Sequence, residues 1–283
     1  MAASGAHGVE EAGGAGRDIA PAVFTPVDLE SWPRREYFAY YFDRLKCRYS
    51  ITATLDITRL MRRRRQLQRR FFPILLYVIM RAVNRQGDEE NAGNSAFRMA
   101  FDVLGRLGRW SYCNPVYTVF HEDDATFSAL WSQWSPDFSV FYETVLADMA
   151  RYGNVRGIKG RSPTPENFCS VSSLPWLSFT SFAQDTYAES RLLFPLIRVG
   201  KHFVQGRKRL IPVAVSVHHA VADGFHTAGL FHDMQAVADT AERWLCGSAL
   251  IRLFRRQYRT RKSSPDALLF VHTRSWPCRA GRA

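Results

Sequence analysis

The sequence predicts an α/β fold in which one mixed β-sheet is covered by helices. Segments that alternate apolar and polar residues, as strands do, are interspersed with segments of helical period, and no internal repeat of fixed length interrupts this order. The hydrophobic fraction of 46%, with 13% aromatic residues, is typical of a chain that buries a substantial core. A length of 283 residues favours one domain with extensions over two full domains.

Composition divides the chain into three parts. Residues 1–21 are rich in Gly and Ala and lack apolar periodicity, so we expect a disordered leader before a folded domain at 22–246. Residues 247–283 carry nine Lys/Arg and one Asp, which is +8 of the net charge of +12. We expect this basic tail to be disordered. An arm that binds nucleic acid is the alternative for the tail, but the domain itself is only weakly basic.

The first half of the domain begins with a helix and a strand. Arg34–Arg44 is aromatic-rich with helical spacing, and Ser50–Ile57 alternates as a half-buried strand does. Thr58–Asn84 then predicts a long helix that is interrupted near Pro73. The polar, Gly/Asn-rich stretch Gly87–Ser95 predicts a surface loop.

The second half alternates strands with two further helices. The helices are expected at Phe127–Tyr152 and at His226–Leu245, where an apolar stripe persists at helical period. Five strands are expected, at Phe97–Phe101, Val116–His121, Val171–Thr180, Leu193–Phe203 and Leu210–His218.

Location and redox state follow from targeting signals and cysteines. The first residues carry acidic side chains and glycines where a secretory signal needs a basic region and an apolar run, so we expect a cytoplasmic protein. The apolar run Phe71–Met80 is too short to span a bilayer. The five cysteines are an odd, widely spaced set without a C-x-x-C pair, so we expect neither a disulfide framework nor a zinc ribbon.

The segment Ile211–His226 carries the strongest chemical signal. A strongly apolar strand ends in His218 and His219, and Asp223 and Gly224 precede a helix. Polar side chains at the end of a strand often line pockets of α/β folds. Strand alternation points the two histidines to opposite faces, so only one of them can serve a given pocket. A histidine there could take a proton from an attacking hydroxyl and return it later.

Other interpretations of this segment are weaker. A His and an Asp four residues apart often serve only as a helix cap or a core hydrogen bond. A zinc site of His218, His219 and His226 lacks a Cys or carboxylate at the usual spacing. No G-x-S-x-G, P-loop or G-x-G-x-x-G segment occurs, so hydrolase and nucleotide-binding fingerprints are missing.

The segment HHAVADGFH resembles the H-H-x-x-x-D-G signature of the chloramphenicol acetyltransferase family. Five further blocks resemble that family in the same order, and together they cover about residues 22–245. These blocks are SWPRREYF (Ser31–Phe38), LDIT (Leu55–Thr58), FRMA (Phe97–Ala100), YTVFHEDDATFSALW (Tyr117–Trp131) and SSLPWLSFTSF (Ser172–Phe182).

The resemblance implies an architecture and a reaction. It implies a homotrimer of two-layer α/β sandwich subunits of the CoA-dependent acyltransferase type, with sites at the subunit interfaces. Acetyl-CoA would be a co-substrate, with no permanently bound cofactor and no metal. Acetyl-CoA and chloramphenicol would enter each site from opposite sides. The acetyl group would pass to the 3-hydroxyl of chloramphenicol, and this would inactivate the antibiotic.

The resemblance also implies roles for individual residues. His219 would be the general base, and Ser172 would donate a hydrogen bond to the oxyanion of the tetrahedral intermediate. Asp223 would support the site through an ion pair with Arg34. The remaining matches are Tyr41, Tyr49 and Phe127 for the antibiotic, and Arg70 and Lys201 for CoA, whose phosphates need basic partners.

One departure from the family pattern keeps other functions open. Arg198 stands where the family usually has a threonine, so acetylation of another small alcohol is the main alternative. A non-catalytic protein that binds a partner through its basic tail is the third hypothesis. Thiol release from acetyl-CoA with and without chloramphenicol separates the three.

Overall fold

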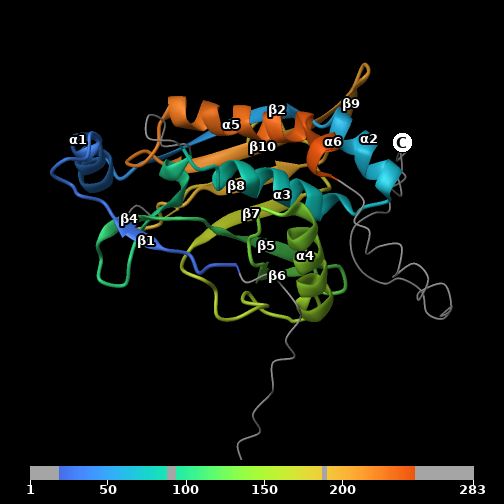
Figure 1. Cartoon of the computed structure of the whole chain (residues 1–283), viewed down its shortest axis with the longest axis horizontal. Helices are drawn as coiled ribbons and strands as arrows, with labels where there is room; N and C mark the ends of the chain where they lie inside the picture. The colour runs from blue at the N-terminus through green and yellow to red at the C-terminus, as the bar shows by residue number, and fades with distance from the viewer. Residues whose placement is uncertain (1–18, 88–93, 187–189, 246–283) are drawn as a thin grey trace, which may run out of the picture. The chain divides into compact units, whose positions relative to one another are not determined.

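The computed structural model of the chain describes residues 19–87, 94–186 and 190–245 (Figure 1). Contacts divide the chain into a unit at Met1–Cys246 and a unit at Gly247–Ala283. The expected basic tail, residues 1–18 of the expected leader and residues 88–93 of the expected loop lie outside the described residues.

Within the described residues, a mixed sheet of seven strands forms the centre of the domain (Figure 1). The strand order is β2-β10-β8-β7-β5-β6, and β9 pairs with the start of β10. The pairs β5–β7 and β7–β8 are parallel, and the others are antiparallel. The predicted α/β class with a mixed sheet is therefore confirmed. The strands are β2 (Arg48–Asp56), β5 (Asn114–His121), β6 (Thr126–Trp131), β7 (Phe168–Leu174), β8 (Leu196–Gly200), β9 (Phe203–Gln205) and β10 (Lys208–His218).

A smaller antiparallel sheet joins three short strands in the order β1-β4-β3. They are β1 (Phe24–Pro26), β4 (Leu107–Trp110) and β3 (Met99–Phe101), which follows a 3-10 turn at Ser95–Arg98. The expected strand at Phe97–Phe101 is therefore present only in its last three residues.

Helices cover one face of the large sheet, and α3 packs against α5 there (Figure 1). Most of α3 is buried because its sequence, FFPILLYVIMRAV, is apolar on all sides. No described helix is both long enough and apolar enough to cross a bilayer. The helices are α1 (Arg35–Ala39), the π-helical turn η1 (Tyr40–Arg44), α2 (Thr58–Leu67), α3 (Phe71–Val83), α4 (Phe138–Tyr152), α5 (Gly224–Asp239) and α6 (Ala241–Trp244).

The two faces of the sheet differ in polarity. Tyr117 is buried on the helix side, where its ring meets Phe72 of α3 at 5.6 Å between centroids. Thr118 and Ser172 are half-buried on the opposite side, which we name the serine face after Ser172. Irregular chain crosses this face, because the Ser216 hydroxyl donates to the carbonyl oxygen of Gln184 at 2.7 Å. The serine face is thus polar and only partly covered.

The long helix expected at Thr58–Asn84 is two helices, and the position of the break was wrong. Gln68 has a φ of 52°, in the left-handed region, and ends α2, and α3 begins at Phe71. Pro73 lies in the first turn of α3, where its missing N–H has no helical partner to lose.

The helix expected at Phe127–Tyr152 was wrong in its first part. Thr126–Trp131 is strand β6, which pairs antiparallel with β5, and α4 starts only after Asp137. The Asp137 side chain accepts from the N–H groups of Ser139 and Val140 and so caps the helix. Three other segments are shorter or broken: β7 ends at Leu174 before Pro175, β8 spans only Leu196–Gly200, and the last helix begins at Gly224 and breaks at Thr240.

Candidate active site

His219 lies directly after β10, and two aromatic rings hold its imidazole. The Tyr41 ring stacks on it at 3.8 Å between centroids with 5° between planes, and the Tyr49 ring meets it edge-on at 5.0 Å. The backbone N–H of His219 donates to the Cys47 carbonyl oxygen at 3.1 Å, which extends the β2–β10 pairing by one residue. Among the described residues, neither ring nitrogen has a hydrogen-bond partner, and Nδ1 is the buried one. Nε2 is therefore the nitrogen available to a substrate.

Tyr49 is fixed from the helix layer. Its hydroxyl lies 2.7 Å from Oγ1 of Thr227 in α5, and this Oγ1 donates to the Asp223 carbonyl oxygen at 3.1 Å. Burial raises the pKa of Tyr49 to about 12, so the phenol stays neutral and does not compete with His219 as a base.

Asp223 ties the start of α5 to the start of α1. Its side chain caps α5 by accepting from the N–H groups of Phe225 and His226. Its other oxygen forms the expected ion pair with Arg34, at 2.9 Å. Burial by itself would raise the pKa of Asp223, but hydrogen bonds from His226 and Arg34 outweigh it and hold the pKa at about 2. Asp223 is therefore ionised at neutral pH.

His218 faces different neighbours. Its Nδ1 accepts from the N–H of Ala220 at 3.2 Å, and its ring lies 5.4 Å from that of Phe42. Burial, with the charge of Arg48, lowers the pKa of His218 to about 4. His218 therefore lacks a basic nitrogen suited to neutral pH. His226 contacts Asp223, and among the described residues no group of three or more His, Cys, Asp or Glu side chains is placed to hold a metal ion.

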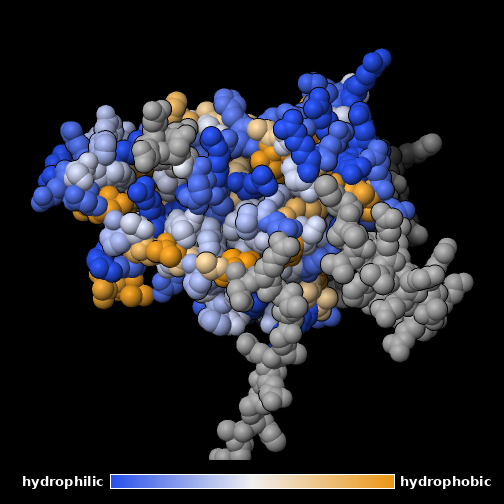
Figure 2. Space-filling model, viewed as in Figure 1, coloured by the Kyte–Doolittle hydropathy of each residue, from blue (hydrophilic) through white to orange (hydrophobic). Residues whose placement is uncertain are grey.

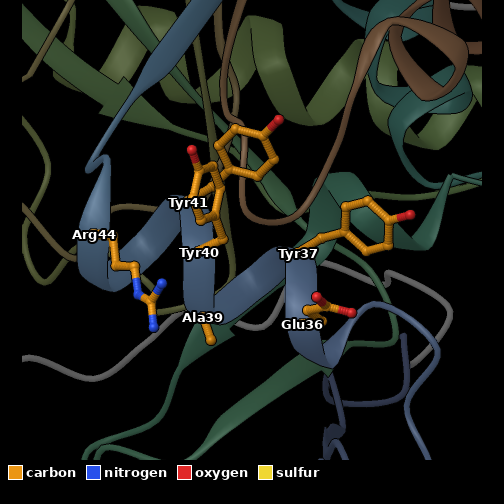
Figure 3. A pocket seen from close by; sticks show the side chains of 6 residues that line it. All are labelled: Glu36, Tyr37, Ala39, Tyr40, Tyr41 and Arg44. Atoms are coloured by element: carbon orange, nitrogen blue, oxygen red, sulfur yellow. The ribbon is translucent and has the colours of Figure 1, made fainter.

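A pocket of about 400 Å³ lies along α1 and η1, and its lining includes Tyr41, the residue that stacks on His219 (Figure 3). The rings of Tyr40 and Tyr41, with centroids 5.2 Å apart, form part of its lining. A π-helical turn is rare and often marks a functional site, and here it places Tyr41 against His219. The pocket is lined by Glu36, Tyr37, Ala39, Tyr40, Tyr41 and Arg44.

Ser172 lies elsewhere, on the serine face. Its hydroxyl is 2.9 Å from Oγ1 of Thr118 on the neighbouring strand β5. Phe127 pairs across β5–β6 with Phe120, whose ring meets that of Trp176 edge-on at 4.8 Å between centroids. Phe127 is 54% exposed. Paired residues share a face, so Phe127 belongs to the serine face and lies four strands away from β10.

The structure does not bring Ser172 and His219 together within one chain. Ser172 pairs with Arg198, and Arg198 pairs with Ala214, five residues before His219. This is about 17 Å along the strand and about 10 Å across two strand spacings, or about 20 Å in all. One oxyanion cannot be reached by both groups of the same chain. The residues that do gather, which we name the histidine cluster, are Arg34, Tyr41, Tyr49, His219 and Asp223.

Arg70 and Lys201 are exposed in a basic region at the C-terminal end of β8. They are neighbours of Phe71 and His202, whose rings lie 6.0 Å apart. Burial lowers the pKa of His202, and the charges of nearby cations lower it further. Such a concentration of positive charge suits phosphate groups. The cations around His202 are Arg209, Arg64, Lys201 and Arg65.

Two contributors to these clusters were missed in the sequence. Thr227 lies four residues after Asp223, and residues four apart are neighbours on a helix. This spacing is the signal that could have placed Thr227 beside Asp223. Thr118 is 54 residues from Ser172, and no local pattern pairs them.

Comparisons with known proteins agree on one family. The chloramphenicol acetyltransferase family profile matches residues 22–235. A chloramphenicol acetyltransferase of Clostridium perfringens is 39% identical over 78% of this chain and 98% of its own length. One from Campylobacter coli is 35% identical over 75% of this chain and 97% of its own length.

Solved structures show a similar fold. A chloramphenicol acetyltransferase superimposes with a TM-score of 0.65 at 21% identity, covering 76% of this chain and 99% of that one. The dihydrolipoamide acetyltransferase of Azotobacter vinelandii gives a TM-score of 0.50 at 16% identity, covering 81% of this chain and all of that one.

Proposed function

The chain belongs to the chloramphenicol acetyltransferase family, and we propose that it transfers the acetyl group of acetyl-CoA to the 3-hydroxyl of chloramphenicol. The observation that carries this proposal is the state of His219. Its imidazole is held between Tyr41 and Tyr49, and Nε2 has no hydrogen-bond partner among the described residues. This is the arrangement that a general base for an alcohol requires.

The transfer proceeds in two steps around His219. Nε2 takes the proton of the hydroxyl while the hydroxyl oxygen bonds to the thioester carbon, which places negative charge on the carbonyl oxygen. The tetrahedral intermediate then collapses, the carbon–sulfur bond breaks, and the imidazolium gives its proton to the leaving sulfur. The products are the acetyl ester and CoA, and His219 is neutral again. Tyr41 and Tyr49 keep the ring in one orientation throughout.

Ser172 donates to the oxyanion from another copy of the chain. The separation of about 20 Å within one chain supports this assignment, because a donor must lie within about 3 Å of the oxyanion. A cyclic homotrimer joins the histidine cluster of one protomer to the serine face of the next at each interface. The half-buried, polar character of the serine face supports such an interface.

The two substrates enter from different sides of this composite site. The pocket beside Tyr41 and the exposed ring of Phe127 receive the aromatic antibiotic, and Tyr49 borders the same imidazole. Arg70 and Lys201 bind the phosphates of CoA, which serves as a co-substrate and not as a bound cofactor. We place the reaction in the cytoplasm, where acetyl-CoA is available.

Thiol release from acetyl-CoA tests the proposal. With the full chain, release should depend on added chloramphenicol, and a 3-O-acetyl product should appear at the same rate. Thiol release with another small alcohol but not with chloramphenicol would contradict chloramphenicol as the acceptor and support acetylation of that alcohol. An absence of release with every alcohol tested would contradict an acetyltransferase and support the non-catalytic alternative.

A further inference from the structure

Arg198 is a half-buried cation on the serine face, and it has no anionic partner among the residues that the structure describes. It lies on β8 between Ser172 of β7 and Ala214 of β10, directly opposite each. Its contacts are all neutral: Nε donates to Gln184 Oε1 at 2.7 Å, and Nη1 donates to the Ile197 carbonyl at 2.9 Å. Nη1 also lies 3.3 Å from the Ser170 hydroxyl. Among the described residues, no carboxylate forms an ion pair with Arg198.

An unpaired charge on a half-buried surface is unfavourable in the free protein. Burial lowers the pKa of Arg198 for this reason, but a guanidinium keeps its proton at neutral pH. Where water is excluded, such a charge attracts any negative charge that arrives nearby more strongly than it would in water. The unpaired Arg198 therefore favours a reaction or ligand that brings negative charge to this face.

The position of the guanidinium sets its distance from Ser172. Ser170 precedes Ser172 by two residues on the same strand and the same face, a spacing of about 7 Å. Because Nη1 lies 3.3 Å from the Ser170 hydroxyl, the charge lies within about 10 Å of the Ser172 hydroxyl. Among the described residues, Arg198 makes no hydrogen bond to Ser172, but a separation in this range allows a substantial electrostatic interaction.

We propose that Arg198 supplies fixed positive charge that stabilises the oxyanion bound by Ser172. The proposal rests on the function proposed above for Ser172. Arg198 touches no reacting atom and acts through the field it places on the serine face. Negative charge on the carbonyl oxygen develops only in the transition state, so the effect falls on kcat and not on KM. Unit charges about 7 to 12 Å apart near a protein surface correspond to about a 10- to 50-fold change in rate.

A structural role is the competing explanation, because Arg198 also tethers Gln184 across the serine face. Three variants separate charge from tether. Arg198→Met removes the charge and retains the apolar length of the side chain, Arg198→Lys keeps a charge without the planar fork, and Gln184→Ala removes the tether with Arg198 intact. Each full-length variant is assayed for kcat, for KM of both substrates and for Tm.

The expected pattern is specific. Arg198→Met should lower kcat by about 10- to 50-fold with both KM values within about twofold, and its Tm should be unchanged or higher because an unpaired charge has gone. Arg198→Lys and Gln184→Ala should keep kcat within about threefold of the wild type.

Two results would overturn the inference. One is a normal kcat in Arg198→Met, and the other is an equal loss of kcat and Tm in Arg198→Met and Gln184→Ala, which would assign Arg198 to tethering. A wild type that releases no thiol with any alcohol would instead refute the proposed function, and this inference with it.

Discussion

At the scale of single residues, aromatic packing and not a carboxylate orients His219, the proposed base. Asp223 already binds Arg34 and His226, and its carboxylate makes no hydrogen bond to His219. The imidazole instead lies between Tyr41 and Tyr49. This differs from a Ser-His-Asp triad, in which a carboxylate sets the tautomer of the histidine.

His219→Ala should abolish acetyl transfer without unfolding the protein. Loss of a general base lowers kcat by about 10² to 10⁴, while the half-buried side chain contributes little to the core. Steady-state kinetics, equilibrium binding of chloramphenicol and Tm together check this. Near-normal turnover in His219→Ala would refute the assignment, as would a folded His218→Ala protein that has lost all chemistry.

His218 should make stability depend on pH. Its pKa is about 4 in the folded protein and near 6.5 when unfolded, so the unfolded chain binds the proton more readily. The contribution of neutral His218 to the free energy of unfolding is complete above about pH 6.5. As the pH falls towards 4, the free energy of unfolding should decrease by up to about 3 kcal/mol. Chemical denaturation across this range should show a flatter profile for His218→Gln than for the wild type.

The control for this series is His232→Gln, on an exposed histidine of α5. That side chain stays in water in both states, so the variant should keep the wild-type profile. The same flattening in both variants would contradict the role of His218.

At the scale of elements, one carboxylate joins the starts of two helical segments. Asp223 caps α5, and Arg34 immediately precedes α1. Since η1 follows α1 and carries Tyr41, this ion pair links the segment that stacks on His219 to the helix that holds Tyr49 through Thr227. The cap of α5 therefore supports both walls of the imidazole.

Asp223→Ala should lower stability and activity together. Loss of the cap should lower the free energy of unfolding by about 1 kcal/mol. Loss of the charge partner of Arg34 should lower it further. Asp137→Ala is the matched control, because Asp137 is an exposed cap of α4 outside the histidine cluster and the serine face. It should lower stability by about 1 kcal/mol with normal kcat. Equal kcat losses in the two variants would mean that stability alone limits activity.

At the scale of the whole molecule, the proposed catalytic groups lie on two separate surfaces of one chain. The histidine cluster forms where β10 ends beside α5, and the serine face lies on the side of the sheet away from the helices. Figure 2 shows one face of the domain, where hydrophilic and hydrophobic side chains are interspersed. A head-to-tail ring of copies allows each chain to use both surfaces at once.

Mixing two inactive variants tests this assembly. His219→Ala and Ser172→Ala, co-expressed in equal amounts, should form mixed oligomers in which about one quarter of the sites combine an intact His219 with an intact Ser172. Activity should recover to about one quarter of the wild type, whereas each variant alone stays nearly inactive. No recovery in oligomers shown to be mixed would place both groups in one protomer's site.

The sequence by itself determined the α/β class, the family and the turn after the last strand. Leu210–His218 is a strongly apolar segment predicted as a strand, and the structure lengthens this strand only by the two residues before it. The pairing of Asp223 with Arg34 followed from the resemblance. Such features are encoded locally or in motif order, because period and spacing depend on neighbours along the chain.

Tertiary structure decided the rest. Thr126–Trp131 is a strand because it pairs with β5, although its residues also suit a helix. The bond of Ser172 to Thr118, the unpaired charge of Arg198 beside them and the distance to His219 all depend on which strands become neighbours. Strand order is set by packing among residues far apart in sequence, and no local period records it.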